Sequence, residues 1–139
     1  MAKKLILYVD GACRGNPGPG SIGILIQDEA SGTNLQISKY IGHTTNNQAE
    51  YSALITAITE AAKLGATQVD IRTDSELMAR QIQGSYKVKS ALLRPLHQKA
   101  KELLVKFHFF TITNIPREDN EVADRLANEA LDHNSKQRF

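Results

Sequence analysis

The chain has 139 residues, 41% of them apolar and 23% charged, with a net charge of +2, which is the balance of one ordinary globular domain. This composition excludes disorder, collagen-like repeats and a coiled coil, and the longest apolar runs, such as Leu5–Val9, are far shorter than the ~18 residues that span a membrane. The single cysteine, Cys13, excludes an internal disulfide, and the apolar stretch after the basic start ends at Asp10, too early for a signal peptide, so we expect a cytoplasmic protein.

The first third of the chain predicts three β-strands. Residues 4–10 are apolar on both faces, as in a central strand. Residues 11–20 are rich in glycine and proline and predict a loop. Residues 21–28 and the alternating segment 35–41 predict two further strands, and the short connection between them predicts an antiparallel meander.

The rest of the chain mixes helices with strands. The apolar spacing predicts helices at 49–64, 75–83, 91–106 and 121–131, and strands at 69–74 and 107–115. This order predicts an α/β fold with a five-stranded mixed sheet, the meander plus two parallel strands, flanked by helices. We expect one domain over residues 1–132 and a frayed polar tail over 133–139.

Four acidic residues lie where solvated charges are unusual. Asp10 and Asp74 close apolar strands, and ligands of open α/β sheets collect at such ends. Glu50 and Asp124 lie on or beside the apolar stripes of their helices, where a buried carboxylate is costly unless it is paired or bound to metal. Each position alone also fits an ordinary role, such as helix capping by Asp74.

The four carboxylates together predict a metal site. Converging at one end of the sheet, they would repel one another unless cations lay between them. Their all-oxygen donor set suits Mg²⁺ or Mn²⁺ rather than zinc. Two such ions ~4 Å apart commonly catalyse phosphoryl transfer, one activating water and the other stabilising the leaving 3′ oxygen. We therefore expect these residues both to bind two ions and to be catalytic.

The segment from Arg80 to Lys106 is strongly basic. It holds seven Lys or Arg residues and one acid, Glu102, so it carries +6 and the rest of the chain −4. A solvated helix face explains this pattern, and so does a surface that binds the phosphates of a polyanionic substrate.

Four motifs resemble type 1 ribonuclease H, of the bacterial and archaeal kind. They are Tyr8–Gly18, Thr45–Tyr51, Thr73–Ser75 and Asn120–Ala127. The similarity covers nearly the whole chain, in the family's order and spacing. It implies the ribonuclease H-like fold, dependence on Mg²⁺ or Mn²⁺, and cleavage of the RNA strand of RNA/DNA hybrids to 5′-phosphate and 3′-hydroxyl ends.

The resemblance also implies roles for individual residues. The four carboxylates match the family's metal ligands. The expected substrate-binding residues are Gly11, Cys13, Asn16, Thr45, Asn46, Asn47, Gln48, Tyr86, Lys87 and Lys89. Three of them, Asn16, Asn46 and Asn47, match residues that sense RNA 2′-hydroxyls in the minor groove, a task that suits short amides. Thr45 matches a residue that binds a DNA phosphate. Helix capping is the ordinary interpretation of Thr45, Asn46 and Asn47, and both roles can hold.

Two features depart from the family pattern. Many members carry a histidine about ten residues before the last aspartate, where this chain has Asn114. Arg117 is the best local substitute, and we expect it to aid product release. Some members also insert a basic protrusion after the helix that follows the third carboxylate, whereas here only residues 84–89 join the two helices.

Two rival functions stay open at this point. One is a nuclease of the same fold that also or mainly cleaves double-stranded RNA, or acts on a Holliday junction. The other is a catalytically inactive hybrid-binding module. The complete set of four carboxylates favours an enzyme, and the asparagines favour a hybrid or RNA substrate. Because the predicted elements leave no apolar patch, we expect a monomer that does not bind membranes.

Overall fold

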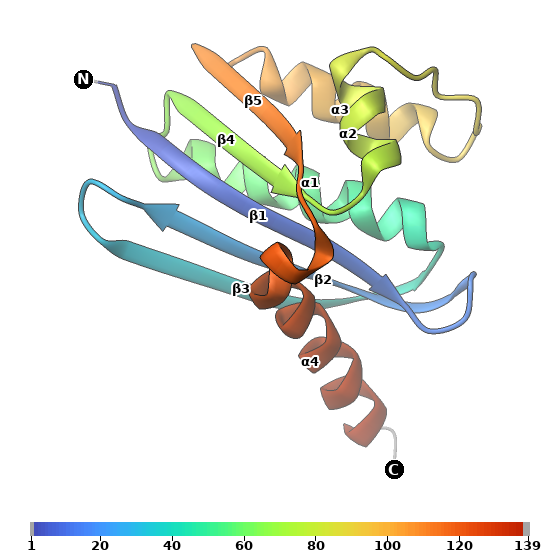
Figure 1. The fold of residues 1–139 in the computed structure, drawn as a ribbon. Coiled ribbons are helices and arrows are strands. Elements are labelled where there is room, and N and C mark those ends of the chain that lie inside the picture. Colours follow the sequence, from blue (N-terminus) through green and yellow to red (C-terminus); the bar gives the residue numbers. More distant parts are fainter. Residues whose placement is uncertain (1, 138–139) are drawn as a thin grey trace.

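A computed structural model describes residues 2–137. Its elements in chain order are β1 (Lys4–Cys13), β2 (Gly18–Asp28), β3 (Thr33–Thr44), α1 (Asn46–Lys63), β4 (Gln68–Thr73), α2 (Glu76–Gln83), α3 (Arg94–Leu104), β5 (Phe109–Asn114), the 3₁₀ helix η1 (Arg117–Asn120) and α4 (Glu121–Gln137). Figure 1 shows α4 in front of a twisted sheet and α1, α2 and α3 behind it. None of the described helices combines the length and apolar character that crossing a bilayer requires.

The sheet has the order β3-β2-β1-β4-β5, with β1 in the centre. Antiparallel pairs join β1 to β2 and β2 to β3, and parallel pairs join β1 to β4 and β4 to β5. The predicted α/β fold, an antiparallel meander of three strands plus two parallel strands, is therefore confirmed.

The main core lies between the sheet and α1. Alternate residues of β1, namely Leu5, Leu7 and Val9, are fully buried and form one cluster with Leu54 and Ile58 of α1. Burying one such side chain contributes roughly 1.5–3 kcal/mol. This core fixes α1 against β1, and therefore fixes the first turn of α1 beside the end of that strand.

Two glycines let the helices approach the sheet closely. A Cβ on Gly11 would lie 2.3 Å from the backbone carbon of Ala49, and one on Gly23 would lie 2.0 Å from the carbonyl oxygen of Ala123. Only glycine fits such contacts without displacing the backbone. Gly23 is also the partner of Asp10 in the pairing of β1 with β2. The two contacts therefore bring α1 and α4 to the same point of the sheet.

Side-chain hydroxyls hold α4 in place. Ser21 Oγ of β2 donates to the carbonyl oxygen of Ala127, and Ser38 Oγ of β3 donates to that of Leu126, both at 2.5 Å. These bonds cross from the sheet to the helix backbone beside the Gly23 contact, so the position of α4 is fixed along its axis.

The first hairpin is tighter than the sequence predicts. Residues 11–13 continue β1 and pair with residues 20–22 of β2, so Asp10 lies within the strand rather than at its end. The predicted ten-residue loop therefore shrinks to residues 14–17. Ladder pairing with β2 outweighs the turn propensity of the glycines here.

Three helix boundaries also differ from the prediction. α1 already begins at Asn46, three residues before the predicted start. α3 begins at Arg94, with Pro95 in its first turn, and Leu92 before it is 60% exposed instead of lying on an apolar stripe. α4 continues to Gln137, so residues 133–137 are helical rather than the frayed tail that we predicted. Residues 138 and 139 of that tail lie outside the described part of the chain.

Candidate active site

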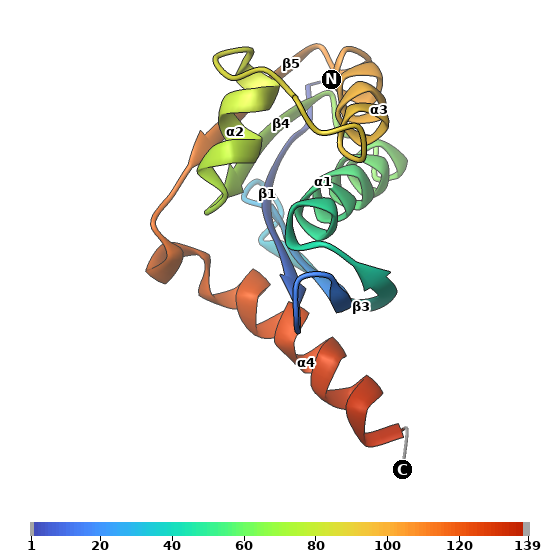
Figure 2. The same ribbon diagram turned by 90° about the vertical axis from the view of Figure 1, so that its right-hand side faces the viewer.

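The candidate site lies where β4 ends beside β1. The parallel pairing of these strands runs as far as Val9 and Thr73, and beyond that point β1 is paired only with β2. Asp10 and Asp74 are the residues that directly follow this last pair. Because the sheet is open there, a side chain from α1 behind the sheet can meet side chains from its front. Figure 2 shows α1 on one side of β1 and the start of α4 on the other.

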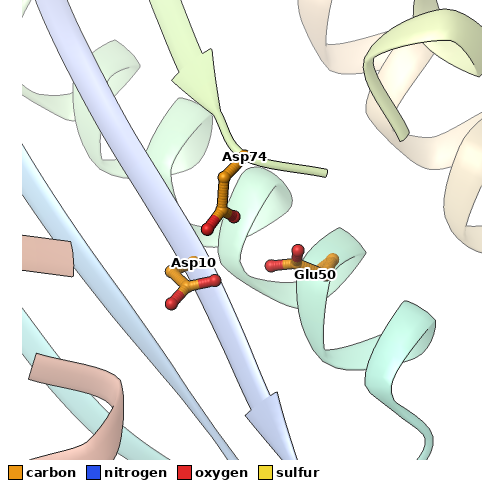
Figure 3. Close-up of side chains that lie close together, drawn as sticks. All are labelled: Asp10, Glu50 and Asp74. Carbon is orange, nitrogen blue, oxygen red and sulfur yellow. The ribbon is translucent and has the colours of Figure 1, made fainter. Parts of the chain in front are cut away.

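Three carboxylates converge at this opening. One oxygen from each of Asp10, Glu50 and Asp74 lies within 4.8 Å of the others. Figure 3 shows the three side chains, from β1, α1 and the end of β4, turned toward one another. The backbone N–H of Gly11 donates to Glu50 Oε1 at 2.5 Å, which fixes the orientation of that carboxylate. The arrangement presents several oxygens to one point, as a divalent cation requires.

Burial and mutual repulsion strongly perturb these acids. Asp10 is 5% exposed and Glu50 is 6% exposed. Burial raises the pKa of Asp10 far above its usual range, and repulsion from Glu50 and Asp74 raises it further. Burial likewise raises the pKa of Glu50, against the opposing effect of the Gly11 hydrogen bond. A bound cation would relieve both effects, so the donor set fits a divalent metal.

Asp124 completes the predicted set from the other side of the sheet. It does not belong to the tight group of three, but it lines the same cavity and acts on Asp10, raising the pKa of that carboxyl further. Arg117 Nη2 lies 3.7 Å from Asp124 Oδ1, and the amide of Asn128 donates to the Asp124 backbone at 2.9 Å. The structure therefore brings all four predicted carboxylates to one site.

A cavity of about 640 Å³ surrounds these carboxylates. Several lining residues were not part of our predicted site, among them the polar residues Glu76 and Asn128. Asn128 lies four residues after Asp124, one turn along the same helix, so its spacing was a usable signal. Glu76 follows the N-cap of α2, where an acid is ordinary, and the sequence offers no signal for it.

Hydrogen bonds around the start of α1 join several predicted substrate residues. Asn16 Oδ1 accepts from the backbone N–H of Asn46 at 3.0 Å, so these two residues, distant in sequence, lie together. Thr45 caps the helix and forms a capping box with Gln48. The capping role of Thr45 is therefore confirmed. The side chain of Gln48 takes part in the same cap, because it accepts from the backbone N–H of Thr45.

The remaining predicted substrate residues fall into two places. Gly11 and Cys13 line the cavity, with Cys13 Sγ 3.1 Å from the carbonyl oxygen of Thr44. Asn47 lies elsewhere, in a groove that it shares with Tyr86, Lys87 and Lys89. The groove runs between α1 and the segment joining α2 to α3, so it offers amide and cationic groups beside the carboxylate site.

The loop that lacks the family histidine closes one side of the cavity. Asn114 Nδ2 donates to the carbonyl oxygen of Thr73 at 3.3 Å, which ties the ends of β5 and β4 together. Arg117 lines the cavity and is largely exposed. No histidine is among the residues that line this cavity in the described part of the chain.

The fold and the site together define a class: a mixed five-stranded sheet that carries a carboxylate centre suited to divalent cations. The sequence profile described as "Reverse transcriptase-like" matches residues 8–130. Ribonuclease H of Coxiella burnetii is 32% identical over 151 residues, covering 95% of each chain. The chain belongs to the ribonuclease H family. Membership implies dependence on a divalent metal, which the carboxylate set fits.

Further comparisons agree with this assignment. Ribonuclease HI of Halobacterium salinarum is 45% identical over 125 residues. The crystal structure of RNase H1 from the same archaeon superposes with a TM-score of 0.89 at 43% identity, covering 94% of this chain and 98% of that one. LC11-RNase H1, solved in complex with an RNA/DNA hybrid, superposes with a TM-score of 0.86 at 44% identity, covering 93% of this chain and 97% of that one.

Some of the relatives are longer than this chain. The match to the Halobacterium protein includes 90% of this chain but only 63% of that protein. The match to the bifunctional protein Rv2228c of Mycobacterium tuberculosis, at 42% identity, includes 93% of this chain but only 36% of that protein.

Proposed function

We propose that the chain is an endoribonuclease that hydrolyses the RNA strand of RNA/DNA hybrids and leaves 5′-phosphate and 3′-hydroxyl ends. The observation that carries this proposal is the convergence of the Asp10, Glu50 and Asp74 oxygens within 4.8 Å. The relative that was solved with an RNA/DNA hybrid supports the choice of substrate.

In this proposal Asp10, Glu50, Asp74 and Asp124 hold Mg²⁺ or Mn²⁺, two ions in all. Bound there, the metal supplies Lewis-acid stabilisation of the phosphoryl oxygens and a nucleophile at neutral pH. Gly11 orients Glu50 through its amide. The burial of Asp10 and Glu50 keeps water from competing for their oxygens.

The amides near the start of α1 recognise the minor groove of the substrate. Asn46 lines the cavity, and its backbone N–H fixes the side chain of Asn16 beside it. The amide nitrogen of Asn16 can then donate to an RNA 2′-hydroxyl. Asn47 continues this surface toward Lys87 and Lys89. We assign the DNA strand to the groove that holds Lys87 and Lys89, because these cations suit the phosphates of that strand.

Arg117 takes part in product release. Its guanidinium lies 3.7 Å from Asp124, and its side chain is 78% exposed. It can therefore leave this weak pair and form a charge-assisted contact with the new 5′-phosphate. This assignment replaces the role that the family gives to the loop histidine.

We also propose that the catalytic domain spans residues 1–132 and acts as a cytoplasmic monomer. The single cysteine and the continuous sheet support this proposal. Sedimentation at micromolar concentration tests the monomer: one species of about 15.3 kDa is expected, and a dimer would contradict it.

A cleavage assay on four labelled substrates tests the function: RNA/DNA hybrid, double-stranded RNA, DNA duplex and a Holliday junction. We expect Mg²⁺-dependent cutting of the RNA strand in RNA/DNA hybrid, and none in DNA duplex or a Holliday junction. Preferential cutting of double-stranded RNA would support the first rival function. Binding of hybrid without cleavage, in either Mg²⁺ or Mn²⁺, would support the inactive module.

A further inference from the structure

Asn120 is a buried amide that the carboxylate chemistry does not itself require. It is 1% exposed and ends η1, directly before α4. Its Nδ2 donates to the backbone carbonyl oxygen of Val9 at 2.9 Å, across 111 residues of sequence. Its Oδ1 is the one buried side-chain polar atom without a hydrogen-bond partner among the described residues.

The orientation of this amide follows from its neighbour. A carbonyl oxygen only accepts, so the Val9 carbonyl requires the NH₂ end of Asn120, and the Oδ1 end is left without a donor. An unpaired buried acceptor is unfavourable. An apolar side chain of similar size would avoid this penalty, so the two N–H groups are what distinguish asparagine at this position.

Those N–H groups lie where the carboxylate-bearing segments meet. Val9 precedes Asp10 and pairs with Thr73, the residue before Asp74. Asn120 itself lies four residues before Asp124 on the approach to α4. It also acts on the Asp74 carboxyl: burial raises the pKa of that group, and a hydrogen bond from Asn120 opposes the rise.

We propose that Asn120 is a positioning residue that fixes the relative placement of Asp10, Asp74 and Asp124 for metal binding. The amide holds the backbone carbonyl of Val9, between Asp10 and the paired strand that leads to Asp74, while the short link to α4 sets Asp124. Hydrogen bonds of this kind orient metal ligands, and their loss commonly costs about 10–100-fold in metal affinity or activity. The inference rests on the proposed function, because it assumes that these carboxylates bind metal.

The test is the variant Asn120→Leu, which keeps the side-chain volume and removes both the N–H donors and the unpaired oxygen. Mn²⁺ affinity is measured by calorimetry without substrate, and kcat and KM are measured on hybrid. We expect Mn²⁺ affinity and kcat each to fall by about 10-fold or more. KM for the hybrid stays within about twofold, because Asn16 and Asn46 are untouched.

Gln81→Leu is the matched control. Gln81 is another buried amide, 4% exposed, and accepts a hydrogen bond from the Tyr51 hydroxyl at 2.7 Å. Its loss lowers the melting temperature but leaves Mn²⁺ affinity unchanged. If Asn120→Leu behaved like this control, with wild-type Mn²⁺ affinity and kcat, Asn120 would be merely structural and the inference would be wrong.

A second measurement on the wild-type protein covers the case in which Asn120→Leu does not fold. The side-chain NH₂ signals of Asn120 are followed by NMR during a Mg²⁺ titration. We expect them to shift together with the backbone signals of Asp10 and Asp74. Static Asn120 signals beside shifting aspartate signals would overturn the inference. A wild-type protein that binds neither ion would instead overturn the proposed function.

Discussion

At the scale of single residues, the site concentrates negative charge that no cation of the described chain neutralises directly at its centre. The ion pairs of the described residues involve neither Asp10 nor Glu50, and only the exposed Arg117 reaches a carboxylate of the set, Asp124. Buried carboxylates without partners destabilise a fold. They are retained, on our account, because a bound divalent metal offsets that cost.

Removing one ligand tests the metal assignment. Asp74→Asn keeps the shape of the side chain and removes one negative charge. We expect turnover in Mg²⁺ to fall by roughly 100-fold or more, since a catalytic metal supplies several kcal/mol and about 1.4 kcal/mol is tenfold. Hybrid binding stays within about threefold, because the groove is intact. The control Asp28→Asn, at the turn between β2 and β3, keeps full activity. Near-wild-type turnover of folded Asp74→Asn would refute the assignment.

The raised pKa values predict how metal-free stability depends on pH. Asp10 and Glu50 ionise at about pH 4 in the unfolded chain but at higher pH in the folded chain. Below about pH 4 both states are protonated, so these groups cost no stability. As the pH rises from about 4 toward the folded pKa values the free energy of unfolding falls, and the fall ends above them. Asp10→Asn removes the larger part of this loss.

Urea unfolding in EDTA measures the effect. We expect the stability of Asp10→Asn relative to wild type to increase by at least about 1.4 kcal/mol, the equivalent of one pKa unit, between about pH 5 and about pH 8. Millimolar Mg²⁺ stabilises wild type at neutral pH more than it stabilises the variant. Parallel pH profiles for the two proteins would show that the carboxylates do not repel one another as the structure indicates.

The absence of a histidine from the described cavity lining predicts a simple pH–rate profile. Without an imidazole of pKa about 6.5 near the substrate, the rate should climb into the alkaline range. Arg117→Ala should lower turnover by about threefold to tenfold through slower product release, whereas His43→Ala, on the exposed end of β3, should leave it unchanged. A large loss in folded His43→Ala would mean that an imidazole does reach the site.

At the scale of elements, we propose that the basic segment around α3 and the start of α1 form the substrate surface. Replacing Lys87 and Lys89 with Ala should weaken hybrid binding and flatten its dependence on salt. Each lost phosphate contact reduces the log–log slope by roughly 0.9. The control, Lys4→Ala with Lys63→Ala, removes the same charge at the far end of β1 and α1. Equal slopes for the two double variants would mean that residues 80–106 form an ordinary solvated face and do not bind the substrate.

The sequence predicts the elements better than it predicts their ends. Periodicity located each strand and each α-helix but not the 3₁₀ helix η1, and the motifs named the four acids that the structure gathers. The end of β1 could not be predicted, because it depends on a distant partner: residues 11–13 extend β1 only by pairing with β2. Two further contacts join distant parts of the chain: Gly23 touches α4, and Asn120 donates to Val9. Local propensity cannot predict either contact.

At the scale of the whole molecule, the site exists because the sheet is open on one side of β1. α1 presents Glu50 from one face and α4 presents Asp124 from the other, and both reach Asp10 past the end of β4. The two close glycine contacts set the distances of the helices from the sheet. The site is therefore a property of the topology, which the solved relatives share at TM-scores of 0.86–0.89.

The central claim is that this carboxylate centre directs water to the RNA strand of a hybrid. The most direct test is mass spectrometry of the products that the wild-type protein makes from one hybrid duplex in Mg²⁺, with Asp10→Asn in parallel. We predict RNA fragments with 5′-phosphate and 3′-hydroxyl ends, an intact DNA strand, and no products from Asp10→Asn. Fragments ending in 2′,3′-cyclic phosphate, or equal cleavage by Asp10→Asn, would contradict the account, because the attack would then come from the RNA's own 2′-hydroxyl or from another site.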